Sequence, residues 1–192
     1  MIINIRGTSG SGKSTLIRRI MDCYETKMAV RRSDEPKRKQ PHGYILSRPK
    51  GRDCVIVGHY ETPCGGCDTI NGMDRIYQLV REGAEAGYDV IFEGLLISAE
   101  FNRTYALHTD DLDLFVVGLD IPLEKCVDSV NERRWAKNPA KPGVNPKNTE
   151  SKWKGTRSTM KKLAEHGVDA QWADRDGAFN LIAERLNLEE CE

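Results

Sequence analysis

The first residues whose types and spacing could do chemistry run from Gly7 to Thr15. They read Gly-Thr-Ser-Gly-Ser-Gly-Lys-Ser-Thr and contain the pattern Gly-x-x-x-x-Gly-Lys-Ser. Glycines at these positions allow a loop whose backbone N–H groups surround a phosphate at the positive end of a helix. Lys13 is then expected to reach the β- and γ-phosphates of a nucleoside triphosphate, and Ser14 to ligate Mg²⁺.

The residues on either side of this loop support the same interpretation. The apolar run Ile2, Ile3 and Ile5 is typical of a buried parallel strand, and Leu16, Ile17 and Ile20 follow at helical spacing. A strand, a glycine loop and a helix in this order make a chance glycine- and serine-rich turn a poor alternative. We therefore predict that the whole loop binds the nucleotide, through Gly7, Thr8, Ser9, Gly10, Ser11, Gly12, Lys13, Ser14 and Thr15.

A carboxylate ends another apolar run. Glu93 closes the run of residues 88–92 and is followed by Gly94. Ligands of open α/β sheets bind at the carboxyl ends of the strands, where this side chain would lie. We predict that Glu93 holds the water shell of Mg²⁺, together with Ser14, or contacts the acceptor. The alternative is a structural hydrogen bond at the strand end.

The stretch from His59 to Ile70 leaves a third predicted strand at the same edge, and three interpretations of it compete. The pair Cys64 and Cys67 could be half of a zinc site, but no second Cys-x-x-Cys completes it. A redox pair lacks the strand and helix context of such motifs. The third interpretation is an acceptor-binding loop in which Asp68 takes the proton of the acceptor hydroxyl. The alternative role of Asp68 is to cap the helix after it.

The net charge of zero hides a strong segregation of charge along the chain. Residues 31–53 hold eight Lys/Arg and three Asp/Glu, and residues 133–162 hold ten Lys/Arg and one acidic residue. A nucleotide must be neutralised, so at least one of these segments is expected to face polyphosphate, and DNA would explain the other. The alternative is a solvated surface.

The composition and the apolar pattern predict one soluble α/β domain over residues 1–192. Hydrophobic residues make up 39% of the chain and charged residues 30%, and no apolar run is long enough for a membrane span. The chain enters its first strand at once, so we expect no signal peptide and a cytoplasmic location. Alternating strands and helices predict three layers around a five-stranded parallel sheet, with strands near residues 2–6, 54–58, 88–94, 112–119 and 168–172.

The remaining segments are less regular. Residues 26–53 are polar and basic, with a short strand expected only near residues 43–46. Helices are expected near residues 13–25, 71–86, 98–107, 120–135, 151–165 and 176–187. Residues 138–150 are rich in Pro, Asn and Lys and are expected to form a loop.

This layout resembles the small P-loop kinases, which include nucleoside monophosphate kinases and polynucleotide kinases. In these families the segment after the fourth strand is a mobile lid that carries arginines, and here it corresponds to residues 133–157. The resemblance implies that Arg133 and Arg134 stabilise the transferring phosphoryl group and that Arg157 binds the nucleotide. Alternatively, these arginines solvate a helix end. In polynucleotide kinases the activating acid follows the second core strand, which is where Asp68 lies.

The loop from Gly58 to Ile70 is similar to one in phage-encoded kinases that phosphorylate 5-hydroxymethyluracil in DNA. This resemblance implies Mg²⁺ and ATP as cofactors, DNA with modified thymine as partner, and the host cytoplasm as location. The target base would be turned out of the stack. The alternatives are a deoxynucleoside monophosphate or other small-molecule kinase, a polynucleotide 5′-hydroxyl kinase, and a nucleotide-binding switch. No Asn-Lys-x-Asp guanine motif supports a GTPase.

Overall fold

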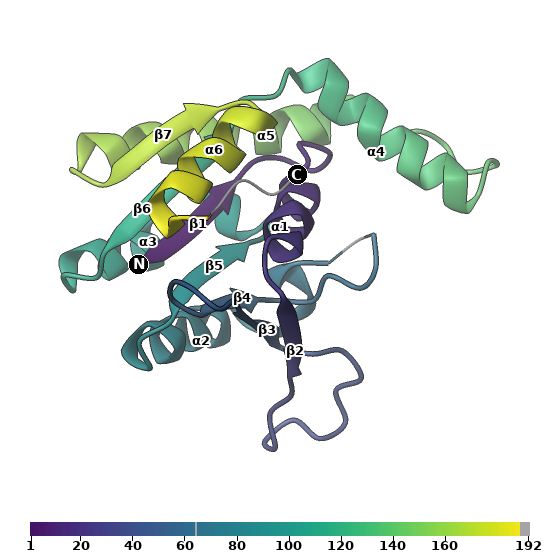
Figure 1. Cartoon of the computed structure of the whole chain (residues 1–192). Coiled ribbons are helices and arrows are strands. Elements are labelled where there is room, and N and C mark those ends of the chain that lie inside the picture. The colour runs from purple at the N-terminus through teal and green to yellow at the C-terminus, as the bar shows by residue number, and fades with distance from the viewer. Residues whose placement is uncertain (64, 189–192) are drawn as a thin grey trace.

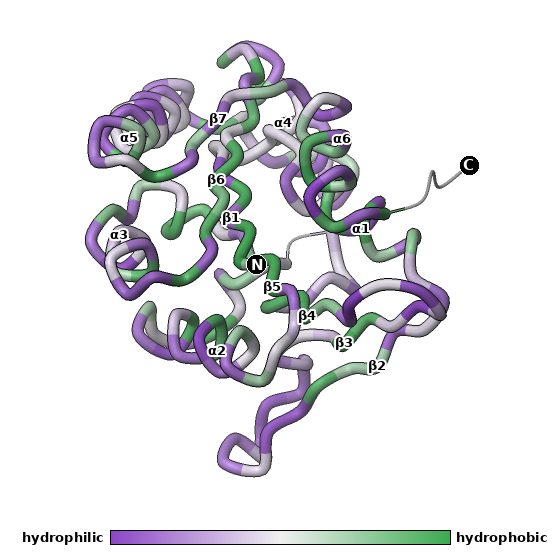
Figure 2. The backbone as a smooth tube through the Cα atoms, turned by 60° about the vertical axis from the view of Figure 1, so that its left-hand side comes forward, coloured by the Kyte–Doolittle hydropathy of each residue, from purple (hydrophilic) through white to green (hydrophobic). Residues whose placement is uncertain are grey.

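The computed structural model describes residues 1–63 and 65–188. A seven-stranded sheet lies in the middle, and helices cover both of its faces (Figures 1 and 2). The strand order is β2-β3-β4-β5-β1-β6-β7. The strands are β1 (Ile2–Arg6), β2 (Thr26–Val30), β3 (Gly43–Ser47), β4 (Cys54–Val57), β5 (Asp89–Glu93), β6 (Leu114–Leu119) and β7 (Asp169–Ala173).

The five predicted parallel strands are confirmed as β1, β4, β5, β6 and β7, which pair in parallel throughout. The predicted total of five strands is wrong, because β2 and β3 extend the sheet in antiparallel register. The sequence of β2 does not indicate a strand, because Thr-Lys-Met-Ala-Val is exposed along most of its length and buries no apolar face. Its backbone pairing with β3, which only tertiary contact reveals, makes it a strand.

The core has two halves, one on each face of the sheet. Ile3 and Ile5 of β1 point into the half that contains helices α1 (Lys13–Asp22) and α6 (Arg175–Leu186). Ile2 points into the other half, which contains α2 (Met73–Glu85), α3 (Asn102–Thr109) and α5 (Pro146–Glu165). Because both faces are covered, the central strands are apolar at most positions, which is why the sequence pattern revealed them.

The remaining helix, α4 (Leu123–Lys137), extends away from the sheet, and residues 138–145 connect it to α5 (Figure 1). The predicted loop over residues 138–150 is too long, since α5 begins at Pro146 rather than at residue 151. Asn145 caps the helix by accepting a hydrogen bond from the Lys147 N–H, and proline is favourable in the first turn. In the described part of the chain, no helix is long and apolar enough to cross a membrane.

Candidate active site

A cavity of about 590 Å³ lies where β1, β4 and β5 end. Its wall is assembled from the Gly7–Thr15 loop, the end of β5, helices α4 and α6, and the strand-end loop, which we define as residues 58–63 and 65–70. The lining residues are Ser9, Gly10, Gly12, Lys13, Ser14, Thr15, Arg18, Pro63, Gly65, Asp68, Thr69, Glu93, Leu95, Ser129, Arg133 and Arg175. The parallel strands therefore bring together the phosphate loop and the two predicted carboxylates.

A buried arginine holds the start of the phosphate loop. The Arg6 guanidinium donates to Asn4 Oδ1 at 2.6 Å and to Thr104 Oγ1 at 2.6 Å. Burial lowers the pKa of Arg6 to about 10. The next residue, Gly7, donates its N–H to Ser98 Oγ at 3.1 Å and accepts from the same hydroxyl at 3.0 Å. The loop therefore leaves β1 from a position tied on two sides to neighbouring elements.

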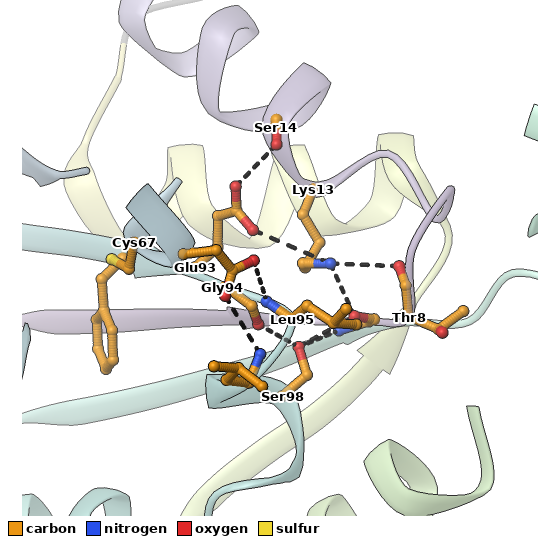
Figure 3. A network of polar contacts seen from close by, with 12 residues as sticks. Thr8, Lys13, Ser14, Cys67, Glu93, Gly94, Leu95 and Ser98 are labelled. Carbon is orange, nitrogen blue, oxygen red and sulfur yellow. Dashed lines mark hydrogen bonds and ion pairs between the residues drawn. The ribbon is translucent and has the colours of Figure 1, made fainter. Parts of the chain in front are cut away.

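Lys13 begins α1 and its ammonium lies inside the loop (Figure 3). Lys13 Nζ donates to the backbone oxygens of Gly7 at 2.8 Å and Thr8 at 3.2 Å, and lies 4.0 Å from Glu93 Oε2. Burial lowers the pKa of Lys13, and the negative charges of Glu93 and Asp68 oppose this shift. The ammonium is thus held at the point where the loop N–H groups and the carboxylates converge.

Glu93 ends β5 and contacts the side chains of both Lys13 and Ser14. Ser14 Oγ donates to Glu93 Oε1 at 2.8 Å (Figure 3). Burial raises the pKa of Glu93, while Lys13 and the Ser14 hydroxyl act in the opposite direction. A hydroxyl and a carboxylate side by side are hard oxygen donors, the set that suits Mg²⁺ bound through water and phosphate. The residues present therefore fit the predicted ion, and they also make the structural hydrogen bond expected as the alternative.

Asp68 lies in the 3₁₀ turn η1 (Cys67–Thr69) and its exposed carboxylate faces the cavity. Its oxygens accept from the N–H groups of Leu95 at 2.7 Å and Leu96 at 3.3 Å. The capping alternative is wrong, because Gly72 precedes α2 and no side chain caps that helix. These two hydrogen bonds hold the Asp68 carboxylate against the backbone that follows β5, on the same side of the cavity as Glu93.

The strand-end loop packs closely on Glu93. Gly66 has φ +81°, and a Cβ built there would lie 2.5 Å from Glu93 Oε1. Tyr60 is buried, and its hydroxyl donates to Val57 O at 3.4 Å. The loop therefore needs glycine at position 66 for two reasons, a left-handed backbone and the close approach of a carboxylate.

The Cys-x-x-Cys pair consists of Cys64 and Cys67. Cys64 lies outside the described residues. Cys67 is buried, its Sγ donates to Val57 O at 3.3 Å, and burial raises its pKa well above the usual value. Among residues 1–63 and 65–188, no group of three His, Cys, Asp or Glu side chains is placed to hold a metal ion.

The structure separates the three predicted arginines. Arg133 lines the cavity, whereas Arg134 borders a smaller hollow beside Ser9. The Arg157 guanidinium pairs with Asp120 and lies 4.0 Å from the centre of the Trp153 ring. Arg157 does not line the cavity, so its predicted contact with the nucleotide is not seen in this conformation.

Two arginines of the cavity wall were not predicted. Arg18 donates to the backbone oxygens of Tyr60 at 3.1 Å and Thr62 at 2.6 Å, which joins α1 to the strand-end loop. Arg175 donates to Ser11 O at 2.9 Å. Arg175 follows the last parallel strand by two residues, so the strand-end rule applied to β7 would have found it. Arg18 lies on a helix face that sequence alone shows only as polar.

Three curated relatives are similar to this chain over most of its length. A 5-hmdU DNA kinase of Pseudomonas phage PaMx11 is 61% identical, covering 96% of both chains. One of Delftia phage PhiW-14 is 30% identical over 97% of this chain and 72% of the relative, and one of Pseudomonas phage M6 is 32% identical over 70% and 73%. The chain belongs to the 5-hmdU DNA kinase family. It is therefore a kinase, and the resemblance to small P-loop kinases is confirmed.

Comparison with models of known protein families finds no match. Among solved structures, a deoxyadenosine kinase from M. mycoides with products dCMP and dCDP bound is 14% identical. It covers 97% of this chain and 99% of its own, with a TM-score of 0.47. This similarity is too low to add to the argument, so the assignment to the kinase family depends on the phage relatives.

Proposed function

We propose that this kinase moves the γ-phosphate of ATP to the hydroxyl of a 5-hydroxymethyl group on deoxyuridine in DNA. The main support for the proposal is the cavity that Lys13, Glu93 and Asp68 line together. The acceptor is inferred from the phage relatives, which are named for it. Since these relatives are phage proteins, the proposal places the reaction in the cytoplasm of an infected cell.

On the donor side, the proposal uses the phosphate loop and the cations around it. The N–H groups of residues 7–15 surround the β-phosphate, and Lys13 turns from Gly7 O and Thr8 O to the β- and γ-phosphates. Arg133 stabilises the charge that develops on the transferring phosphoryl group. We propose a lid over residues 133–157, whose closure would bring Arg134 and Arg157 toward the same site. Those two roles stay predictions.

Ser14 and Glu93 would hold Mg²⁺, because their oxygens lie next to each other beside Lys13. When bound, the ion would neutralise charge on the β- and γ-phosphates and hold them in line. Glu93 must then be a carboxylate, and Lys13 favours this form by lowering a pKa that burial raises.

On the acceptor side, Asp68 is the proposed base. Two backbone N–H groups fix its carboxylate, which leaves lone pairs free to accept the hydroxyl proton. The acceptor oxygen forms a bond to the γ-phosphorus as the bond to the β,γ-bridging oxygen breaks. ADP leaves, and the hydroxyl proton goes to Asp68.

The test is transfer of labelled γ-phosphate from Mg-ATP to matched acceptors. The set contains DNA with internal 5-hydroxymethyluracil, the same DNA with thymine, 5′-hydroxyl DNA and free deoxynucleoside monophosphates. We expect label only on the 5-hydroxymethyluracil DNA. Label found only on a 5′ end or only on a monophosphate would still show a kinase, but it would contradict the proposed acceptor.

A further inference from the structure

The donor and acceptor chemistry leaves one strongly charged segment unused, the connection between β2 and β3. We call residues 31–41 the basic loop. It projects from the edge strands of the sheet, away from the helix α4 (Figure 1), and is hydrophilic along its length (Figure 2). It holds five Lys/Arg and two acidic residues.

Both acidic residues of the basic loop are already paired. Asp34 lies 3.2 Å from the Arg32 guanidinium and 2.5 Å from that of Arg75 on α2. Glu35 lies 3.6 Å from Arg75 and 3.3 Å from His42. These pairs fasten the loop to α2, and the cations neutralise the two negative charges of the loop.

The other cations of the loop are left over. Four of them, Arg31, Lys37, Arg38 and Lys39, form no ion pair in the part of the chain that the structure describes. Three of them, Arg31, Lys37 and Lys39, are exposed. Arg31 donates to Lys39 O at 2.5 Å, so the two arms of the loop are joined and the cations are held on one short structure.

The fourth cation connects the basic loop to the acceptor side of the cavity. Arg38 donates to Thr69 O at 2.6 Å and to Thr69 Oγ1 at 3.2 Å. Thr69 lines the cavity next to Asp68. The basic loop therefore reaches the cavity wall at Thr69, the residue next to the proposed base. The larger basic segment, residues 133–162, begins instead at Arg133, within α4 on the donor side.

We propose that the basic loop binds the phosphates of DNA that flank the target nucleotide. This inference depends on the proposed function, because an acceptor nucleotide within a strand brings phosphates past the rim at Thr69. Exposed lysines and arginines without carboxylate partners bind such phosphates by releasing counterions. Contacts of this kind carry no sequence information, so they position DNA and leave recognition of the modified base to the cavity.

The experiment compares Lys37→Ala/Lys39→Ala with a matched double variant, Lys50→Ala/Lys161→Ala, in the full chain. All four lysines are exposed. Lys50 lies in the turn before β4 and Lys161 near the end of α5 before β7, so both are near the strand ends opposite the cavity. Binding of labelled 5-hydroxymethyluracil and thymine DNA is followed by fluorescence anisotropy at several salt concentrations, and transfer to the modified DNA is measured in parallel.

For the basic-loop variant we expect Kd for both DNAs to rise about tenfold, and the slope of log K against log salt to fall by about two. KM for modified DNA rises with it, and the control pair behaves as the unaltered chain does. Equal DNA affinity in the two variants would overturn the inference while leaving the proposed function intact. If the unaltered chain binds DNA but never phosphorylates the modified base, the proposed function fails separately.

Discussion

The donor side and the acceptor side of the cavity are built in opposite ways. The centre of the donor side is one continuous segment, Gly7–Thr15, whose charge and hydrogen-bond donors follow each other along the chain, with Arg133 and Arg175 beside it. The acceptor side combines Asp68, which is held by the N–H groups of Leu95 and Leu96, with Thr69. Glu93 lies between the two sides, next to Lys13 and Ser14. Phosphate binding is therefore encoded locally, while the acceptor site exists only after β4 and β5 have paired.

The largest effect is expected on the donor side, from Lys13→Met. The variant loses the cation of the phosphate loop, so transfer should fall at least about a thousandfold for every acceptor. Without Lys13 the pKa of buried Glu93 should rise further, because the charge that opposes burial is gone. Steady-state transfer and ATP binding measure this, with far-ultraviolet circular dichroism as the check on folding. A folded variant with full activity would contradict the kinase mechanism.

Asp68→Asn should impair the acceptor side and leave the donor side intact. The amide oxygen can still accept from Leu95 N–H, but the side chain cannot take a proton at neutral pH. We expect kcat to fall about a hundredfold or more, with ATP affinity within about twofold of the unaltered chain. A rate that stays the same would assign the base to another carboxylate.

Gly66→Ala tests how closely the strand-end loop must approach Glu93. Both the left-handed φ and the 2.5 Å approach to Glu93 Oε1 oppose a side chain, so we expect the free energy of unfolding to drop by about 2–3 kcal/mol. Gly87→Ala is the control, because its φ is +86° and no atom of residues 1–63 or 65–188 lies within 4 Å of an added Cβ. It should cost about 1 kcal/mol from backbone strain alone.

Urea unfolding of both alanine variants measures the difference. Equal losses in the free energy of unfolding at positions 66 and 87 would show that the close contact with Glu93 does not add to the cost of a side chain at position 66. In that case the acceptor side would tolerate more variation than the hydrogen bonds suggest.

Arg175→Ala should affect only the donor side. The guanidinium holds Ser11 O at 2.9 Å and lines the cavity, so its loss loosens the phosphate loop. We expect KM for ATP to rise about fivefold, with KM for DNA unchanged, since one charged hydrogen bond contributes about 1.5–3 kcal/mol at most. A rise in KM for DNA would mean that the two sides are coupled through this residue.

The smallest effect is expected at Cys67, on the acceptor side. Burial raises the pKa of this thiol, so the thiolate fraction at neutral pH is very small and grows only as pH rises. Alkylation of folded protein by iodoacetamide, located by mass spectrometry, should leave Cys67 unmodified at pH 7, and Cys67→Ser should keep activity within about threefold. Rapid modification at pH 7 would reopen the redox interpretation of the Cys-x-x-Cys pair.

Sequence patterns predicted those parts of the fold in which local chemistry and tertiary structure agree. The central parallel strands were visible because burial on both faces favours apolar residues, as in Leu114–Leu119, which is buried at every position. The short strand expected near residues 43–46 is β3, but β2 was missed, because it is an exposed edge strand that sequence composition does not distinguish from a loop. Arg18 was not predicted either, because its hydrogen bonds to Tyr60 O and Thr62 O join residues far apart in the chain.

By itself, the sequence determined the phosphate loop, the residues that fill it and the ends of the strands from which Glu93 and Asp68 emerge. These features depend on neighbours within a few positions, and backbone geometry alone converts them into structure. Only the tertiary structure decided that Asp68 is held by Leu95 and Leu96, that Arg133 faces the cavity while Arg157 pairs with Asp120, and that the basic loop reaches Thr69. Such contacts join residues far apart in the chain, and their partners are chosen by packing, which no local pattern records.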